Sequence, residues 1–302
     1  MPEGRECDMS PEPVSALPEL PDLSAHWIAI LRIYDVFADL AKRHGLRHYV
    51  MFGSALGAVR HKGFIPWDDD MDVAMPRVDY DRFVEIARKE LPADLEWVDW
   101  RNTPEFPDIC GKIQETDRNL VERLERTLGR PLPHGLFLDV FPLDGYPRGF
   151  FARLRRRFLR RMLRARIVYL SPTSKRTFRV RLTRFVGRFA GAFFDHFDTI
   201  RDRFRIEEGI ARSAPTYEGP YFCNYSTGSN ELVIFFPVRC LEPPSTGEFE
   251  GRKVPLPHDV DTLLRIQYGD YMTPPPPERR VLKHSACRPA PWKYGPTGGD
   301  RP

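Results

Sequence analysis

The chain has 302 residues, of which 41% are hydrophobic and 12% aromatic, so it can bury a sizeable core as one elaborated domain or two small ones. No run approaches the roughly 18 to 20 apolar residues of a membrane-spanning helix, and the N-terminus does not resemble a secretion signal, so we expect a cytoplasmic protein. The net charge is only +4, and the five cysteines are scattered, which excludes a CxxC metal clip and an evident disulfide framework.

In chain order, residues 1–23 form a proline-rich leader, and a helix begins at Ser24, the expected cap, and ends at Gly45. Residues 47–52 favour a strand that leads into a turn at Gly53 and Ser54 and a short helix. Around residues 70–75, apolar side chains alternate with carboxylates, which predicts a half-buried strand.

A second amphipathic helix follows through Ala87, and residues 95–100, 110–115 and 136–142 favour strands. We therefore predict an α+β (or α/β) fold, with a mixed sheet, flanking helices and a mostly helical, basic second half. Predicted domains are a catalytic core over 24–145, a basic helical part over 146–273 and a proline-rich tail over 274–302. In the second part, short strands are expected at 232–236 and a helix at 259–268.

Asp70 and Asp72 are the first candidate functional residues. Two residues apart on a strand, their side chains project from one face roughly 7 Å apart and can share a divalent cation. The turn at Gly53 and Ser54 lets the backbone approach a phosphate, which suits phosphoryl chemistry. Asp139, a carboxylate within an apolar strand, is the expected third ligand, because its burial is costly unless it meets a cation.

Two alternatives bear on these carboxylates. Asp144 is a weaker candidate for the third ligand, since it lies in a turn-like sequence. The spacing of Asp68, Asp70 and Asp72 also matches the start of a calcium-binding EF-hand loop, but Val73 and Asp79 occupy positions that need glycine and glutamate, so that template fails.

Residues 52–77 closely resemble the signature of the LicD family, the lipopolysaccharide cholinephosphotransferases, which are related to fukutin and fukutin-related protein. Residues 138–145, 254–257 and 267–272 resemble the same family, and the resemblance is thin over 150–221. It implies a nucleotidyltransferase-type fold in which Gly53, Ser54, Asp70, Asp72 and Asp139 match the family's pattern.

The resemblance further implies transfer of phosphocholine, or of another phospho-alcohol such as ribitol phosphate, from a CDP-linked donor to a glycan or lipid-linked glycan. Mg²⁺ (or Mn²⁺) would be held by Asp70, Asp72 and Asp139, with Asp139 the first choice as base. CDP-choline is the preferred donor. Which alcohol is transferred stays open, with aromatic residues at 67, 221, 225, 268 and 271 as candidates for a choline headgroup and polar residues at 224, 230 and 267 for a polyol.

Arg60, His61 and Lys112 are candidate phosphate contacts, with a helix-end role open for His61 and a solvated strand position for Lys112. For Trp67, packing in the core is favoured over stacking on a ligand.

The basic stretch over 145–194 contains no Asp or Glu and fifteen Lys or Arg. Its first helix is amphipathic and cationic, which fits either an anionic membrane surface at the cytoplasmic face or an ordinary solvated face. Alternative functions are transfer of the nucleotide monophosphate itself, or an inactive transferase fold that binds membrane or nucleic acid. No nucleic-acid-binding motif is present, so we expect no nucleic-acid partner.

Overall fold

The computed structural model describes residues 23–103, 110–117, 119–121, 125, 135–170, 178–190, 200–224 and 235–280. Its α-helices are α1 (Ser24–Arg43), α2 (Phe52–Arg60), α3 (Arg77–Glu90), α5 (Phe150–Leu170), α6 (Phe178–Ala190), α7 (Ile200–Ala211) and α8 (Val260–Tyr268). Short 3₁₀ turns are η2 (Val238–Cys240) and η3 (Pro277–Arg279). The strands are β1 (Tyr49–Val50), β2 (Asp72–Pro76), β3 (Leu95–Val98), β4 (Gly111–Glu115), β5 (Phe137–Gly145), β6 (Tyr221–Cys223), β7 (Phe235–Pro237), β8 (Ser245–Phe249) and β9 (Arg252–Leu256).

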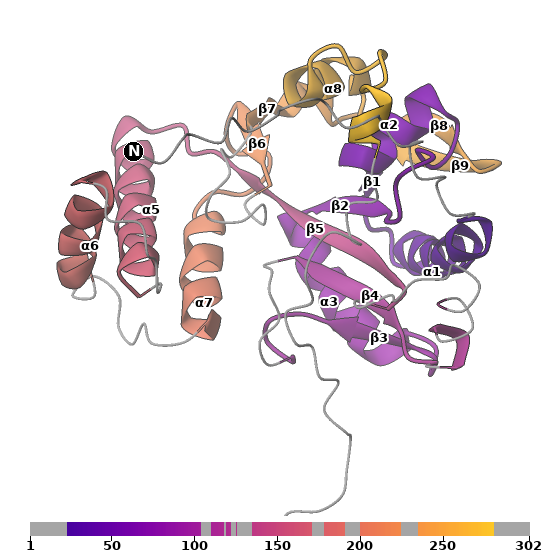
Figure 1. Ribbon diagram of the computed structural model, residues 1–302, viewed down its shortest axis with the longest axis horizontal. Coiled ribbons are helices and arrows are strands. Elements are labelled where there is room, and N and C mark those ends of the chain that lie inside the picture. Colours follow the sequence, from indigo (N-terminus) through magenta and orange to yellow (C-terminus); the bar gives the residue numbers. More distant parts are fainter. Residues whose placement is uncertain are drawn as a thin grey trace, which may run out of the picture.

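A seven-stranded mixed sheet forms the centre of the fold. The strand order is β1-β2-β5-β4-β3, and β6 joins the end of β5 and pairs with β7. The strands β2 and β5 are parallel, whereas the other pairs are antiparallel. Helices α1 and α3 both pack against this sheet, and the hairpin β8-β9 lies beside α2 (Figure 1). The predicted α+β fold with a mixed sheet is confirmed.

The ends of α1 differ slightly from the prediction. Leu23, not Ser24, occupies the cap position and no side chain caps the helix, because Ser24 is already helical. Gly45 ends the helix as predicted, with φ of 62°, and the Leu46 N–H bonds the Ala41 carbonyl at 2.8 Å. Similarly, the Asp259 side chain accepts a 3.0 Å hydrogen bond from the Thr262 N–H and caps α8, within the predicted range.

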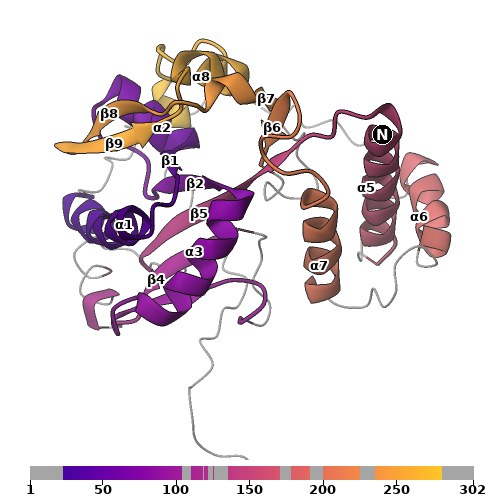
Figure 2. The ribbon, with the colours of Figure 1, turned by 180° about the vertical axis from the view of Figure 1, so that it is seen from behind.

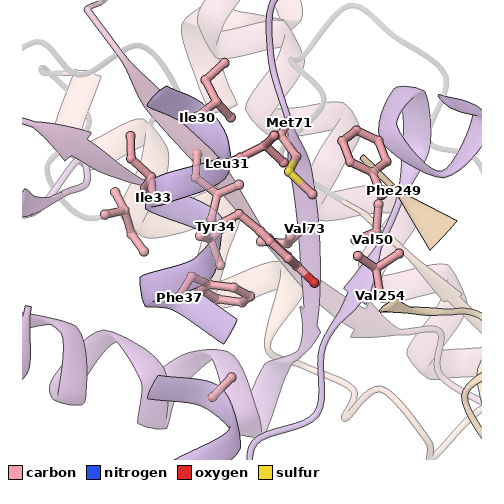
Figure 3. Close-up of a cluster of buried hydrophobic side chains, with 14 of the residues drawn as sticks. Ile30, Leu31, Ile33, Tyr34, Phe37, Val50, Met71, Val73, Phe249 and Val254 are labelled. Atoms are coloured by element: carbon pink, nitrogen blue, oxygen red, sulfur yellow. The ribbon is translucent and has the colours of Figure 1, made fainter. Parts of the chain in front are cut away.

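The main core lies between α1, the sheet and the β8-β9 hairpin. Figure 3 shows its centre, where Tyr34 and Phe37 of α1, Val73 of β2 and Val254 of β9 belong to one buried cluster. The expectation that β2 is half-buried, with one face solvated, is wrong. Ala74 points to the other face and is fully buried in a second cluster that includes Phe222. Both faces of β2 are therefore covered, and only its first residue, Asp72, is partly exposed.

Helices α5, α6 and α7 lie together beyond the end of β5, apart from α1 and α3 in both views (Figures 1 and 2). The chain after residue 145 nevertheless contributes Phe249, Val254, Leu256 and Leu264 to the main core. Residues on both sides of position 145 therefore share one core. Residues 1–22 of the predicted leader, 281–302 of the predicted tail and 232–234 of the strand expected at 232–236 lie outside the described residues.

Among the residues that the structure describes, no helix has both the length and the apolar character needed to cross a membrane. Cys110, Cys223 and Cys240 are buried and are not in disulfides, and the other two cysteines lie outside the described ranges.

Candidate metal and phosphate site

Three carboxylates converge at the start of β2. Each of Asp70, Asp72 and Asp139 offers a carboxylate oxygen, and these three oxygens all lie within 4.8 Å of one another. The parallel register of β2 and β5 places Asp72 opposite Asp139, and Asp70 lies in the loop just before β2. Asp70 is 9% and Asp139 5% exposed. Such a set of oxygen donors suits a hard divalent cation such as Mg²⁺ or Mn²⁺.

Two side chains of α1 hold the backbone of the acidic loop. The Trp27 indole N–H donates to the Asp68 carbonyl at 3.0 Å, and the His26 Nε2 is 2.8 Å from the Asp69 carbonyl. Both contacts lie at the turn that precedes Asp70. The helix that forms much of the core therefore also fixes where the loop carboxylates point.

Gly53 and Ser54 lie in the first turn of α2 rather than in a separate turn before it. Phe52 makes the sharp entry into this helix with a positive φ of 54°. The Ser54 hydroxyl is buried, and its oxygen accepts a 2.8 Å hydrogen bond from the Asp72 N–H. Ser54 therefore positions a candidate metal ligand, while its own proton can still be donated.

Lys112 lies beside the carboxylates and is not the solvated strand residue of the alternative interpretation. The antiparallel register of β4 and β5 sets it opposite Asp139, and its ammonium group forms an ion pair with the Asp139 carboxylate. The same Nζ sits 3.7 Å from the centre of the Phe137 ring, and the side chain is 18% exposed. On β5, Asp139 thus lies between Asp72 of β2 and the Lys112 ammonium group of β4.

Arg60 and His61 form a second, separate group at the end of α2. The Arg60 guanidinium donates a 2.6 Å hydrogen bond to the Tyr271 carbonyl, and His61 meets Trp67 edge-on. Burial and the nearby charge of Arg280 lower the pKa of Arg60, and burial and Arg60 lower the pKa of His61. Trp67 is partly buried against the main core, with the Arg280 guanidinium 5.2 Å from its ring centre.

Tyr268 is the aromatic candidate that the structure brings to the carboxylates. It ends α8, a helix that contacts α2, and is 40% exposed. Desolvation by the surrounding protein raises the pKa of its hydroxyl, and the negative charges of Asp72, Asp68 and Asp70 raise it further. The Gln267 amide donates to the Tyr268 hydroxyl at 3.1 Å. The Tyr268 hydroxyl therefore lies within electrostatic range of the acidic cluster.

The other candidates for contact with the headgroup lie in buried, exposed or undescribed positions. Tyr271 is buried, and its hydroxyl donates to Asp261 at 2.7 Å. Tyr221 is 44% exposed on β6, whereas Asn224 is buried just after that strand. Tyr225 and Asn230 lie outside the described residues.

Asp144 has a structural partner instead of a cation. It is fully buried, and its two oxygens accept hydrogen bonds of 2.8 and 2.7 Å from the Arg77 guanidinium. Burial lowers the pKa of Arg77, but the charge and hydrogen bonds of Asp144 outweigh it and raise the pKa overall. Glu208 of α7 also pairs with Arg77, at 3.2 Å. The alternative that assigns Asp144 as third metal ligand therefore does not fit.

The sequence did not reveal several supporting residues. Nothing in the pattern of α1 distinguishes His26 and Trp27 from ordinary helix positions, because their partners lie more than forty residues away. Arg280 gives no local signal of its contact with Trp67. Tyr268 was found only as one of several aromatic residues within a segment that resembles the LicD family.

Comparison with known families adds to the geometry of the carboxylate cluster. Residues 45–108 match the family described as "LicD/FKTN/FKRP, nucleotidyltransferase domain". The matched range contains Gly53, Ser54, Asp70 and Asp72, while Asp139 lies beyond it. Residues 45–108 are therefore similar to the domain of this family.

Comparison with individual proteins extends the similarity beyond that domain. The chain is 27% identical over 266 residues to the lipopolysaccharide cholinephosphotransferase LicD of Haemophilus influenzae, covering 85% of this chain and 94% of the relative. It is also 36% identical over 131 residues to an uncharacterized protein of Rickettsia prowazekii, covering 39% of this chain and 47% of that protein. The first similarity supports a transferase.

Proposed function

We propose that this protein transfers phosphocholine, or a similar phospho-alcohol, from a CDP-linked donor to a hydroxyl of a cell-surface glycan or its lipid-linked precursor. The observation that carries the proposal is the convergence of Asp70, Asp72 and Asp139 within 4.8 Å, in a chain similar to a cholinephosphotransferase along most of its length. A set of three carboxylates has little use in binding a donor diphosphate unless cations lie between them.

In the proposed reaction, the acceptor hydroxyl oxygen forms a bond to the phosphorus that carries the alcohol. The bond from that phosphorus to the bridging oxygen breaks, and CMP leaves with the electron pair. Asp70, Asp72 and Asp139 would hold a divalent cation, which would supply positive charge to the diphosphate and the leaving oxygen. The hydroxyl proton passes to a carboxylate, for which Asp139 is our candidate because it lies on a different strand from Asp72.

Four other side chains, of Lys112, Ser54, Arg60 and His61, have distinct roles in this proposal. Lys112 orients Asp139 through their ion pair and adds positive charge beside the phosphates. Ser54 fixes the backbone at Asp72. Arg60 donates a hydrogen bond to His61, which meets Trp67 edge-on, and the pair would favour an anionic ligand at that end of α2.

The test is to analyse the products with CDP-choline, CDP-ribitol, CDP-glycerol and UDP-sugars, Mg²⁺ and a glycan acceptor. Free CMP together with acceptor that has gained phosphocholine supports the proposal. Acceptor that has gained CMP, with phosphocholine released, would instead establish nucleotidyl transfer by the same fold. Asp72→Asn should be inactive, and Asp39→Asn, which alters an exposed carboxylate on α1, serves as its control.

Tyr268 offers a test of the headgroup. A quaternary ammonium group is attracted to the face of an aromatic ring and needs no hydroxyl. With CDP-choline as donor, Tyr268→Phe should keep the KM of the donor near that of the wild type, whereas Tyr268→Ala should raise it about tenfold, equivalent to roughly 1.4 kcal/mol. If Tyr268→Phe is as impaired as Tyr268→Ala, the hydroxyl is the recognised group, and a polyol donor is favoured.

A further inference from the structure

Helices α5 and α6 carry two stripes of exposed apolar side chains. The stripe on α5 consists of Phe150, Phe151, Leu154 and Phe158, exposed by 71%, 81%, 54% and 43%. The stripe on α6 consists of Leu182, Phe185 and Phe189, exposed by 53%, 63% and 57%. The two helices are in extensive contact and lie side by side in both views (Figures 1 and 2). Exposed aromatic residues are thus concentrated on this pair of helices.

The stripes are separate from the faces that pack inward. Residues 150, 154 and 158 recur every four positions, and 182, 185 and 189 every three or four, so each set follows one side of its helix. The packing face of α5 is elsewhere, where Leu163 is buried against Ile210 of α7. Phe185 and Phe189 contact each other with ring centres 5.3 Å apart. A surface of this kind in a soluble fold marks an interaction site.

The charge around the stripes is positive. Residues 145–194 include fifteen Lys or Arg and no acidic residue. Arg153, Arg155, Arg157 and Arg161 of α5 and Arg188 of α6 are exposed. Arg156 is an exception to the predicted cationic face, because it is buried and donates hydrogen bonds to the carbonyls of Gly145, at 2.6 Å, and Ala211, at 3.1 Å.

We propose that the α5 and α6 stripes, with their flanking arginines, dock this protein peripherally on an anionic lipid surface. Aromatic side chains at the headgroup level combined with arginines form the chemistry that such surfaces bind. A second copy of the chain is a poorer occupant, because it would bring arginine against arginine. A nucleic acid would pair with the charges of the arginines but leave the apolar side chains of the stripes exposed to water.

The docking surface is fixed relative to the candidate site. Arg156 anchors α5 to the last residue of β5, the strand that carries Asp139. Binding through the stripes would therefore hold the carboxylates at a set orientation to the bilayer. That consequence for a lipid-linked acceptor rests on the proposed function, whereas vesicle binding does not.

The test is flotation of the full chain with vesicles of phosphatidylglycerol and phosphatidylcholine, compared with phosphatidylcholine alone. Wild type should bind the anionic vesicles at low salt and bind less as salt rises. Two separate variants, Phe185→Ser with Phe189→Ser, and Arg155→Glu with Arg157→Glu and Arg161→Glu, should each weaken binding about tenfold or more. Ile28→Ser with Val78→Ser, which removes exposed apolar side chains from α1 and α3, should leave binding unchanged.

Thermal unfolding and size-exclusion chromatography of each variant complete the design. Because the altered side chains are exposed, unfolding should be unaffected. No binding by wild type at low salt, or binding by both variants that equals that of wild type, would overturn the proposal. Self-association of wild type that the Phe→Ser changes abolish would also overturn it and identify a second copy as the occupant. If wild type binds the anionic vesicles but shows no transfer activity, the result counts against the proposed function alone.

Discussion

Asp139 and Asp144 lie on the same strand, yet replacing each by asparagine should have opposite consequences. Both are buried carboxylates in β5. Asp144 holds the buried Arg77 guanidinium with two hydrogen bonds, which stabilise the fold. Asp139 faces two other carboxylates and Lys112. Asp144→Asn should therefore lower stability, and Asp139→Asn should abolish turnover with little effect on stability.

The expected magnitudes follow from burial. Removing one partner of a buried ion pair costs about 3 to 5 kcal/mol. The low end, about 3 kcal/mol, is expected for Asp144→Asn, because Glu208 still pairs with Arg77. Asp139→Asn loses a partly exposed pair with Lys112 but relieves repulsion among the carboxylates, so its free energy of unfolding should change by no more than about 1 kcal/mol.

Urea unfolding, followed by tryptophan fluorescence, and CMP release measure the two effects in the same preparations. The midpoint of Asp144→Asn should fall by about 1 M or more. Asp94→Asn, which removes an exposed ion pair with Arg32, is the control and should shift it little. The reasoning is refuted if Asp144→Asn unfolds like wild type but is inactive, since Asp144 would then belong to the site.

Further predictions address packing, pH and charge. Gly145→Ala should lower the free energy of unfolding by about 1 to 3 kcal/mol, because its Cβ would lie 1.9 Å from the Pro215 carbonyl oxygen. Gly209→Ala, with open space around its Cβ, should not, and equal urea midpoints for the two variants would contradict this reasoning. Burial lowers the pKa of His48 from 6.5 to about 4. Between these pH values the unfolded chain binds one more proton than the folded chain, so the free energy of unfolding should fall by up to about 3 kcal/mol as the pH drops from 6.5 to 4. His48→Leu should show a shallower fall when unfolding is measured across that range. Lys112→Met should reduce CMP release at least tenfold, and full activity would remove Lys112 from the site.

Local patterns were sufficient to predict the secondary structure of the first half. Apolar spacing predicted α1 and α3, and short β-prone runs predicted β3, β4 and β5 close to their observed bounds. The wrong prediction for the second face of β2 has its cause in a contact distant in sequence. Ala74 is buried because β6 and β7 form a second cluster over that face of the sheet, and nothing near residue 74 announces this.

In the candidate site, too, local patterns predicted some residues, whereas contacts distant in sequence determine the roles of others. The spacing of Asp70 and Asp72 and the apolar run around Asp139 pointed to the three carboxylates before their proximity was known. The sequence could rank Asp144 below Asp139 but could not exclude it, because its partner Arg77 begins a helix on another part of the chain. Arg156 looked like one arginine among many, and only the carbonyls of Gly145 and Ala211 distinguish it.

The central claim, that Asp70, Asp72 and Asp139 hold a divalent cation for transfer from a CDP-linked donor, is tested most directly by titrating Mn²⁺ into the protein with CDP-choline present. Electron paramagnetic resonance reports the free Mn²⁺ that remains. Wild type should take up Mn²⁺, and Asp70→Asn, Asp72→Asn and Asp139→Asn should each weaken uptake at least tenfold, while Asp39→Asn should not. Mn²⁺ uptake that is equal in wild type and all three carboxylate variants would contradict the account.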